Sequence, residues 1–131
     1  MAKITIDGLD QIMGGLNRKG GRLRGVITEA LQMSAKALTE QLKKEEMSSF
    51  RAPTGELGGH LTTSPVGHAA GASMIDVYAK GNYIGVRGAP RRAGLVAAMV
   101  ENKHKNPWNA RAMKRSEKRI NAIIAETLRG E

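Results

Sequence analysis

Apolar side chains recur at helical spacing over residues 22–49, which is the clearest pattern in this sequence. Leucine, valine, isoleucine and alanine stand three or four positions apart from Leu23 to Leu42, and most charged residues lie off this stripe. A helix with one buried face has this arrangement. The spacing therefore predicts one long amphipathic helix over residues 22–49, and a shorter pattern of the same kind predicts a helix over residues 7–17.

Alternation of apolar and polar residues predicts strands elsewhere in the chain. Residues 3–6 are expected to form a short edge strand. Residues 74–80 and 83–88 alternate on either side of Gly81-Asn82, a pair of residues that suits a two-residue turn. We therefore expect these two segments to pair as an antiparallel hairpin with one apolar face.

Two segments are expected to be loops. Residues 51–73 are rich in glycine, proline, serine and threonine, although residues 60–66 can pair as a strand. Residues 89–108 begin with a basic stretch, and their apolar run at 95–100 suits either a strand or a short helical turn.

A last amphipathic helix is predicted from Asn109, as its cap, to about Leu128. Together these elements predict a single domain over residues 1–131 with an α+β fold. A long N-terminal amphipathic helix and a C-terminal helix would pack on a small antiparallel sheet. Only 3% of the residues are aromatic, so we expect a thin core that gains from burial against neighbouring copies.

Composition narrows the classes of function. The chain has no cysteine, which excludes disulfides and thiolate metal sites, and no apolar run of the roughly 20 residues that a membrane span needs. No apolar signal core is present near Met1, so we expect a soluble protein that is made in the cytoplasm. The three histidines match no zinc motif, and Thr54 has no activating base at a motif spacing. We therefore expect no enzyme, no metal and no cofactor.

Positive charge is concentrated in one part of the chain. The net charge is +9, and residues 87–119 carry ten lysines and arginines against two acids. Such a segment is a solvated face, a contact for acidic patches on neighbouring subunits, or a contact for nucleic-acid phosphates with Trp108 stacked on a base. The candidate contact residues are Arg91, Arg92, Lys103, Lys105, Trp108, Arg111, Lys114, Arg115 and Lys118.

Four short segments occur in a recognisable order. They are Gly8-Leu9-Asp10, then Ala52-Pro53-Thr54-Gly55-Glu56-Leu57 after the long helix, then Ala97-Ala98-Met99-Val100-Glu101, and finally Asn106-Pro107-Trp108-Asn109-Ala110. This order resembles the gene-product-ten-like family of lambdoid long-tailed phages, whose members are neck or tail-completion components. The residues that match the family's motifs are Thr54, Gly55, Leu57, Glu101 and Pro107. The family's usual acid before the Thr-Gly pair is absent, and Asn102-Lys103 replaces its Phe-Gly pair.

The resemblance implies a structural virion protein of the phage neck that forms a homo-oligomeric ring, expected to be a hexamer. Its partners would be the head connector or stopper and the tail terminator or tail-tube proteins, with genomic DNA nearby and no membrane. The protein would assemble in the host cytoplasm and reside in the tail or neck region of the virion. The alternative function is that of a small basic nucleic-acid-binding protein, which rests on the strongly basic segment of residues 87–119 and on Trp108.

Overall fold

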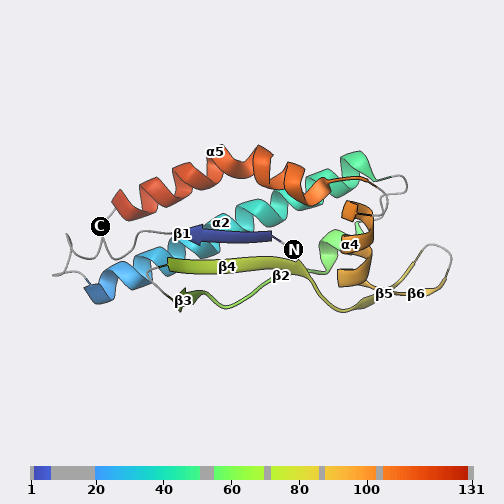
Figure 1. The fold of residues 1–131 in the computed structure, drawn as a ribbon, viewed down its shortest axis with the longest axis horizontal. Helices are drawn as coiled ribbons and strands as arrows, with labels where there is room; N and C mark the ends of the chain where they lie inside the picture. Colours follow the sequence, from blue (N-terminus) through green and yellow to red (C-terminus); the bar gives the residue numbers. More distant parts are fainter. Residues whose placement is uncertain are drawn as a thin grey trace.

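The computed structural model describes residues 2–6, 20–50, 55–69, 72–85, 88–102 and 105–129, and for residues 20–23 and 69 the backbone alone. Its elements are β1 (Ala2–Ile6), α2 (Gly20–Ser49), α3 (Glu56–Gly59), β2 (Leu61–Thr63), β3 (Gly67–Ala69), β4 (Ala72–Ala79), β5 (Asn82–Ile84), β6 (Pro90–Arg92), α4 (Ala93–Asn102) and α5 (Trp108–Arg129). The expected α+β fold is confirmed, with a long N-terminal helix, a C-terminal helix and a small antiparallel sheet (Figure 1).

The main sheet is built around β4, its longest strand. β1 pairs antiparallel along one side of β4, with Ile4 opposite Ile75, and is the edge strand that its sequence predicts. β2 and β3 pair antiparallel with the other side of β4. Successive side chains of a strand point to opposite faces, and one face of β4 is accordingly buried through Ser73, Ile75, Val77 and Ala79.

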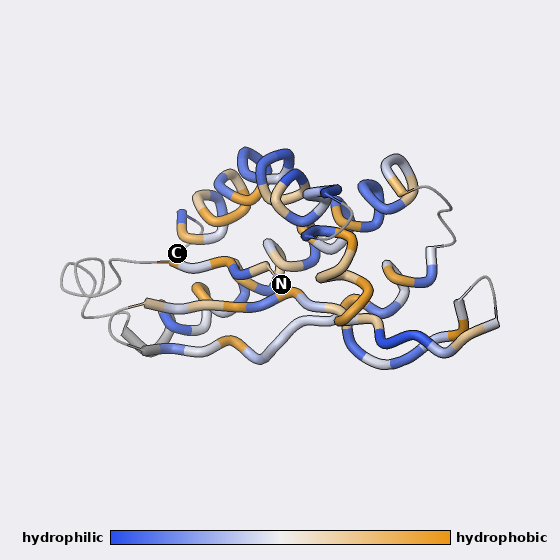
Figure 2. The backbone as a smooth tube through the Cα atoms, turned by 45° about the vertical axis from the view of Figure 1, so that its right-hand side comes forward, coloured by the Kyte–Doolittle hydropathy of each residue, from blue (hydrophilic) through white to orange (hydrophobic). Residues whose placement is uncertain are grey.

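Helix α2 packs against this sheet, and α5 runs along α2 (Figure 1). The core joins Leu31, Leu38 and Leu42 of α2 to the buried face of the sheet, and Ala112 and Ile120 of α5 belong to the same cluster. Figure 2 shows hydrophilic residues on the outer side of α5 and apolar residues on the side that faces the rest of the molecule. The helix predicted over residues 22–49 is thus confirmed, and α5 reaches the sheet mainly beside β1.

The expected hairpin of residues 74–80 with 83–88 is wrong. β5 pairs instead with β6 in a separate two-stranded sheet, with Ile84 opposite Pro90, and we call these two strands the arm. β4 cannot pair with β5 because β1 and β2 already occupy its two sides, and Gly81, with a φ of 89°, turns the chain away. Residues 86 and 87 of the expected hairpin lie outside the described residues.

Both segments that were expected to be loops contain regular structure. Residues 51–73 include α3, β2 and β3, and residues 89–108 include β6 and α4. β2 lies within the strand expected at residues 60–66, and the apolar run at 95–100 is helical. The short strands β2 and β3 carry little sequence pattern of their own. They form because β4 offers unpaired backbone N–H and C=O groups on the side that β1 does not cover.

The last helix begins at Trp108, one residue before the expected start. Asn109 is therefore not its cap but its second residue. The helix expected over residues 7–17 lies outside the described residues. Within the part of the chain that the structure describes, no helix combines the length and the apolar character needed to cross a membrane.

Candidate functional site

The two long helices are joined by a buried carboxylate. Glu45 of α2 is 1% exposed, and its two oxygens accept hydrogen bonds from Arg111 Nε at 2.6 Å and from Arg115 Nη1 at 2.7 Å. Gln41 donates a third hydrogen bond to Glu45 at 3.1 Å. Two of the candidate contact residues therefore stabilise the packing of α5 on α2, which the sequence analysis did not predict.

The ionisation of Glu45 follows from these contacts. Burial by itself raises the pKa of the Glu45 carboxyl, but the hydrogen bonds from Arg111, Gln41 and Arg115 and the charge of Arg115 outweigh it. The pKa consequently lies below its ordinary value. Glu45 is therefore ionised at neutral pH, and each arginine meets a full negative charge.

The outer side of the α2–α5 pair carries more positive charge than negative charge. Arg119 forms an ion pair with Glu40 at 3.2 Å, in which both side chains remain about half exposed. Lys114 and Lys118 are exposed beside the arginines, and Lys36 and Lys44 are exposed on α2. We call this set the cationic face: Lys36, Lys44, Lys114, Arg115, Lys118 and Arg119.

Trp108 is not available to a partner or to a nucleic-acid base in this structure, so the expectation that it makes such a contact is wrong. Its side chain is fully buried, its indole Nε1 donates a hydrogen bond to the carbonyl oxygen of Ala97 at 3.3 Å, and its ring meets Phe50 edge-on at 5.3 Å. A protein with few aromatic residues uses this one to join α4, α5 and the end of α2.

Glu101 caps the last helix from outside it. Its carboxylate accepts hydrogen bonds from the backbone N–H groups of Asn109 at 2.8 Å and Ala110 at 3.3 Å. These are first-turn donors that have no partner within the helix, and a negative charge there also meets the positive end of the helix dipole. Pro107, just before the helix, loses no helical hydrogen bond by lacking an N–H group. The Glu101 and Pro107 of the family-like segments therefore define one helix start.

A second carboxylate has the same role at α3. Gly55 precedes this short helix with a φ of 80°, and Leu57 within it is buried. The buried Glu46 accepts hydrogen bonds from the N–H groups of Leu57 at 3.2 Å and Gly58 at 2.9 Å. Thr54 lies outside the described residues.

The arm presents apolar and basic side chains to solvent. Arg91 and Arg92 are exposed on β6, Ile84 on β5 is 63% exposed, and Leu95 in the first turn of α4 is 59% exposed. At the root of the arm Tyr83 stacks on His60 with ring centres 5.4 Å apart. Burial raises the pKa of Tyr83, the charge of Glu46 raises it further, and Arg91 acts in the opposite direction.

Two candidate contact residues, Lys103 and Lys105, lie in the sequence between the end of α4 and the start of α5. Lys105 is exposed, with a φ of 53°, and Lys103 lies outside the described residues. The candidates are therefore not one surface. Among the described candidates, the structure places Arg91 and Arg92 on the arm, Lys105 before α5, Arg111 at the interface of α2 and α5, Lys114, Arg115 and Lys118 on the cationic face, and Trp108 in the core.

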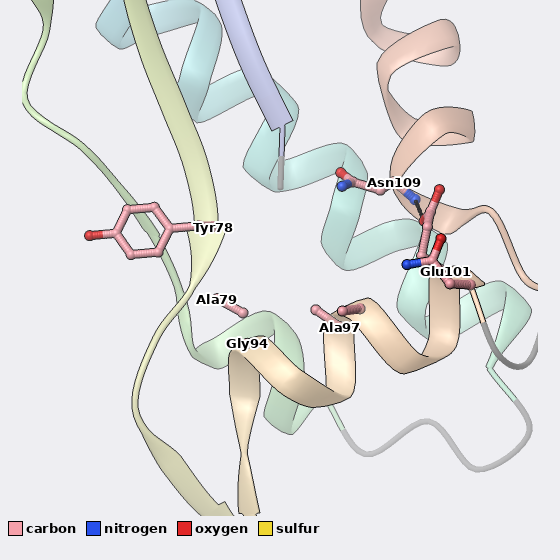
Figure 3. Close-up of a pocket in the computed structure, with 8 residues that line it drawn as sticks. Tyr78, Ala79, Gly94, Ala97, Glu101 and Asn109 are labelled. Atoms are coloured by element: carbon pink, nitrogen blue, oxygen red, sulfur yellow. Dashed lines mark hydrogen bonds between the residues drawn. The ribbon is translucent and has the colours of Figure 1, made fainter.

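A pocket of about 330 Å³ lies between the end of β4 and α4. Figure 3 shows Ala79 and Ala97 facing this space, whereas Tyr78 points away to the other side of β4. A Cβ atom on Gly94 would stand 3.2 Å from the carbonyl oxygen of Ala79, so glycine permits this close approach. The Glu101 carboxylate of this pocket is already bound to the start of α5, and the described residues that line the pocket include no pair of nucleophile and base.

The two histidines that the structure describes lie apart, at opposite ends of β4. His60 Nδ1 lies 3.1 Å from the carbonyl oxygen of Lys80, His68 lies beside Ser73 on the sheet, and His104 is outside the described residues. Among the residues that the structure describes, no group of three or more His, Cys, Asp or Glu side chains is placed to hold a metal ion.

Sequence reasoning missed Glu45 and Glu46, which stabilise the helix pair and α3. Glu45 stands three residues after Leu42 on the predicted apolar stripe. A carboxylate on a buried stripe is a signal for a buried ion pair, because it needs a charged partner. The partner itself, 66 positions away, has no signature in the sequence.

No family model, curated protein or solved structure matches this chain.

Proposed function

We propose that this protein is a structural component of the neck of a long-tailed bacteriophage. Copies of the chain form a ring at the head–tail junction, and the ring joins the tail to the head connector or completes the tail. The role is assembly, without catalysis or a cofactor. Support comes from the ordered family-like segments and from the α+β architecture, which agrees with the fold that the resemblance implies.

The observation that carries the proposal is the arm. Among the strands that the structure describes, β5 and β6 pair only with each other. Figure 1 shows them extending from one end of the molecule, while the start of α2 and the end of α5 lie at the other end. A contact between opposite ends of two copies is head-to-tail, and head-to-tail contacts close into rings when the rotation allows it.

Apolar exposure on and beside the arm supplies a driving force. Ile84 and Leu95 are both more than half exposed in the single chain. Burying a leucine or isoleucine side chain fully contributes about 1.5–3 kcal/mol relative to exposure. Single exposed apolar residues are ordinary. These two, however, belong to neighbouring elements: Ile84 lies on the arm, and Leu95 lies in the first turn of α4, which follows the arm directly. Ordering costs reduce the gain, so several copies of the contact are needed for a stable ring.

The ring in this proposal is a homohexamer located between the head connector or stopper and the tail terminator or tail tube. Arg91 and Arg92 would contact acidic groups on a neighbouring subunit or on one of these proteins, since both are exposed. The protein assembles in the host cytoplasm, becomes part of the virion, and stands close to the genomic DNA.

The first experiment measures the mass of the purified protein by size-exclusion chromatography with light scattering over a range of concentrations. We expect a ring in the wild type and a shift to monomer in the double variant Ile84→Ser, Leu95→Ser, with the dissociation constant raised about tenfold or more. The matched control is Met33→Ser, Met47→Ser, which removes two side chains of 46% and 55% exposure from α2. A monomeric wild type, or equal losses in both variants, contradicts self-assembly through the arm.

Self-assembly alone does not establish a neck role. We therefore expect the purified protein to bind isolated tails or connector rings, and electron cryomicroscopy of the junction to show a ring built from this chain. A protein that assembles but binds neither structure contradicts the neck role and leaves the assembly surface intact.

A further inference from the structure

We propose that the cationic face is a second binding surface, which takes the phosphate backbone of a nucleic acid without reading its bases. The proposal does not depend on the neck role or on the arm. It rests on charges that the tertiary structure brings together from two helices and that the sequence separates by about 70 positions.

The face is built from parallel stripes. Lys36, Glu40 and Lys44 stand four residues apart on α2 and therefore share one side of that helix. Arg111, Arg115 and Arg119 form the same spacing on α5 and meet Glu45 and Glu40 across the helix interface. Lys114 and Lys118 form a neighbouring stripe on the outer side of α5. The three ion pairs fix α5 beside α2. We infer that the exposed lysines of the two helices therefore lie on one surface.

The carboxylates on this surface do not balance its cations. The stripes hold seven lysines and arginines but one glutamate, Glu40, and both Glu40 and the buried Glu45 are already paired with arginines. The exposed Glu117, next to Lys118 in the chain, still leaves the cations in excess. Lys36, Lys44, Lys114 and Lys118 are exposed and enter no ion pair within the described residues. Local charge of one sign attracts a polyanion.

The dimensions suit a phosphate backbone. Eight residues separate Lys36 from Lys44, which corresponds to about 12 Å along a helix, whereas successive phosphates of one strand advance about 3.4 Å along a duplex. Three or four phosphates therefore fall within reach of the long lysine side chains. The buried Trp108 cannot stack on a base, so this surface supplies charge and no base recognition.

An acidic protein is the competing partner, and two features favour the nucleic acid. Four of the six cations of the face are lysines, which protein interfaces tend to exclude. Lysine also acts as a compact point charge, whereas the planar arginine groups that recognise carboxylates are engaged with Glu45 and Glu40. Met33 and Met47 are exposed on α2, the helix that carries Lys36 and Lys44. Exposed methionines are common in protein interfaces, so the experiment also measures binding to an acidic polypeptide.

The test is fluorescence anisotropy with a labelled duplex of about 30 base pairs of mixed sequence, between about 50 and 200 mM NaCl. The face variant carries Lys36→Gln, Lys44→Gln, Lys114→Gln and Lys118→Gln. The control variant carries Lys3→Gln, Lys80→Gln, Arg92→Gln and Lys105→Gln, four exposed cations outside the face. Both variants have the same net charge, and circular dichroism checks that each is folded.

We expect wild-type binding whose logarithm falls with the logarithm of salt at a slope of about −3 to −4. The face variant should bind at least about tenfold more weakly with a slope shallower by about one for each lysine that contacts a phosphate, and the control variant should bind within about threefold of wild type. Equal losses in both variants overturn the proposal, because net charge alone would then account for binding. Undetectable wild-type binding, or tighter binding to polyglutamate than to the duplex, also overturns it.

Discussion

Glu45 Oε2 and Arg111 Nε lie 2.6 Å apart although 66 positions separate these residues in the chain. The carboxylate is buried and the arginine side chain is 28% exposed. Replacing Glu45 by glutamine leaves two arginines without their charge partner at the helix interface. We expect the free energy of unfolding to fall by about 2–3 kcal/mol. Breaking a buried ion pair ordinarily costs about 3–5 kcal/mol, and the loss here is smaller because the partly exposed Arg115 can turn its charge to water. Urea unfolding measures this loss.

The matched control for that variant is Glu40→Gln, since Glu40 pairs with Arg119 on the same two helices but at the exposed surface. We expect a loss of at most about 0.5 kcal/mol there. Similar losses in the two variants would show that burial does not strengthen the Glu45 contact.

The stability of the protein should fall in acid through Glu45. Its pKa in the folded protein lies below the ordinary value of 4.5, so ionised Glu45 stabilises the fold fully above that value. As the pH falls, the unfolded chain takes up a proton before the folded chain does, and the stabilisation is lost as the pH passes through the folded-state pKa. Urea unfolding between about pH 7 and pH 3 should therefore show a steeper decline for the wild type than for Glu45→Gln, which has no proton to bind. Parallel declines would contradict the assignment.

Loss of the Glu101 cap should weaken the start of α5. We expect Glu101→Ala to lower the free energy of unfolding by about 1–2 kcal/mol, because two backbone donors lose their acceptor and the helix dipole loses a facing negative charge. Thermal unfolding followed by circular dichroism measures the change. Glu117→Ala, at an exposed position of the same helix, should stay within about 0.5 kcal/mol of wild type. A Glu101 variant as stable as the Glu117 variant would argue against the cap.

Trp108 is the one tryptophan of the chain and reports on its own surroundings. Because it is buried against Phe50 and Ala97, its fluorescence should be shifted to the blue and protected from acrylamide. Addition of a nucleic acid should leave the emission unchanged, since the cationic face binds phosphates at a distance from the indole. Quenching by single-stranded DNA would instead restore the base-stacking role expected from the sequence.

The sequence predicted best where one pattern was long enough to be unambiguous. The apolar stripe over residues 22–49 and the pattern that ends near Leu128 both correspond to helices, with starts and ends within two residues of those expected. The edge strand at residues 3–6 was also recognisable. The hairpin around Gly81 was not, because alternation shows that a segment is a strand but does not say which strand it pairs with.

The candidate site shows the same division. Composition identified the basic segment, and its residues Arg91, Arg92, Lys114 and Lys118 are exposed; that they contact a partner stays a prediction. Periodicity could not show which of the neighbouring residues Lys114 and Arg115 forms an ion pair and which remains exposed to solvent. Only the position of Glu45 on the facing helix decides that Arg115 is held in an ion pair while Lys114 stays in solvent.

The sequence by itself determined the two long helices, the strands that include residues 3–6 and 74–79, and the uneven charge, because each depends on residues within a few positions of one another. The tertiary structure decided the partners: β4 with β1 and β2 rather than β5, Trp108 with Phe50, and Glu45 with two arginines of α5. These contacts join residues far apart in the chain. Their formation depends on which surfaces meet when the core closes, and no local pattern records that choice.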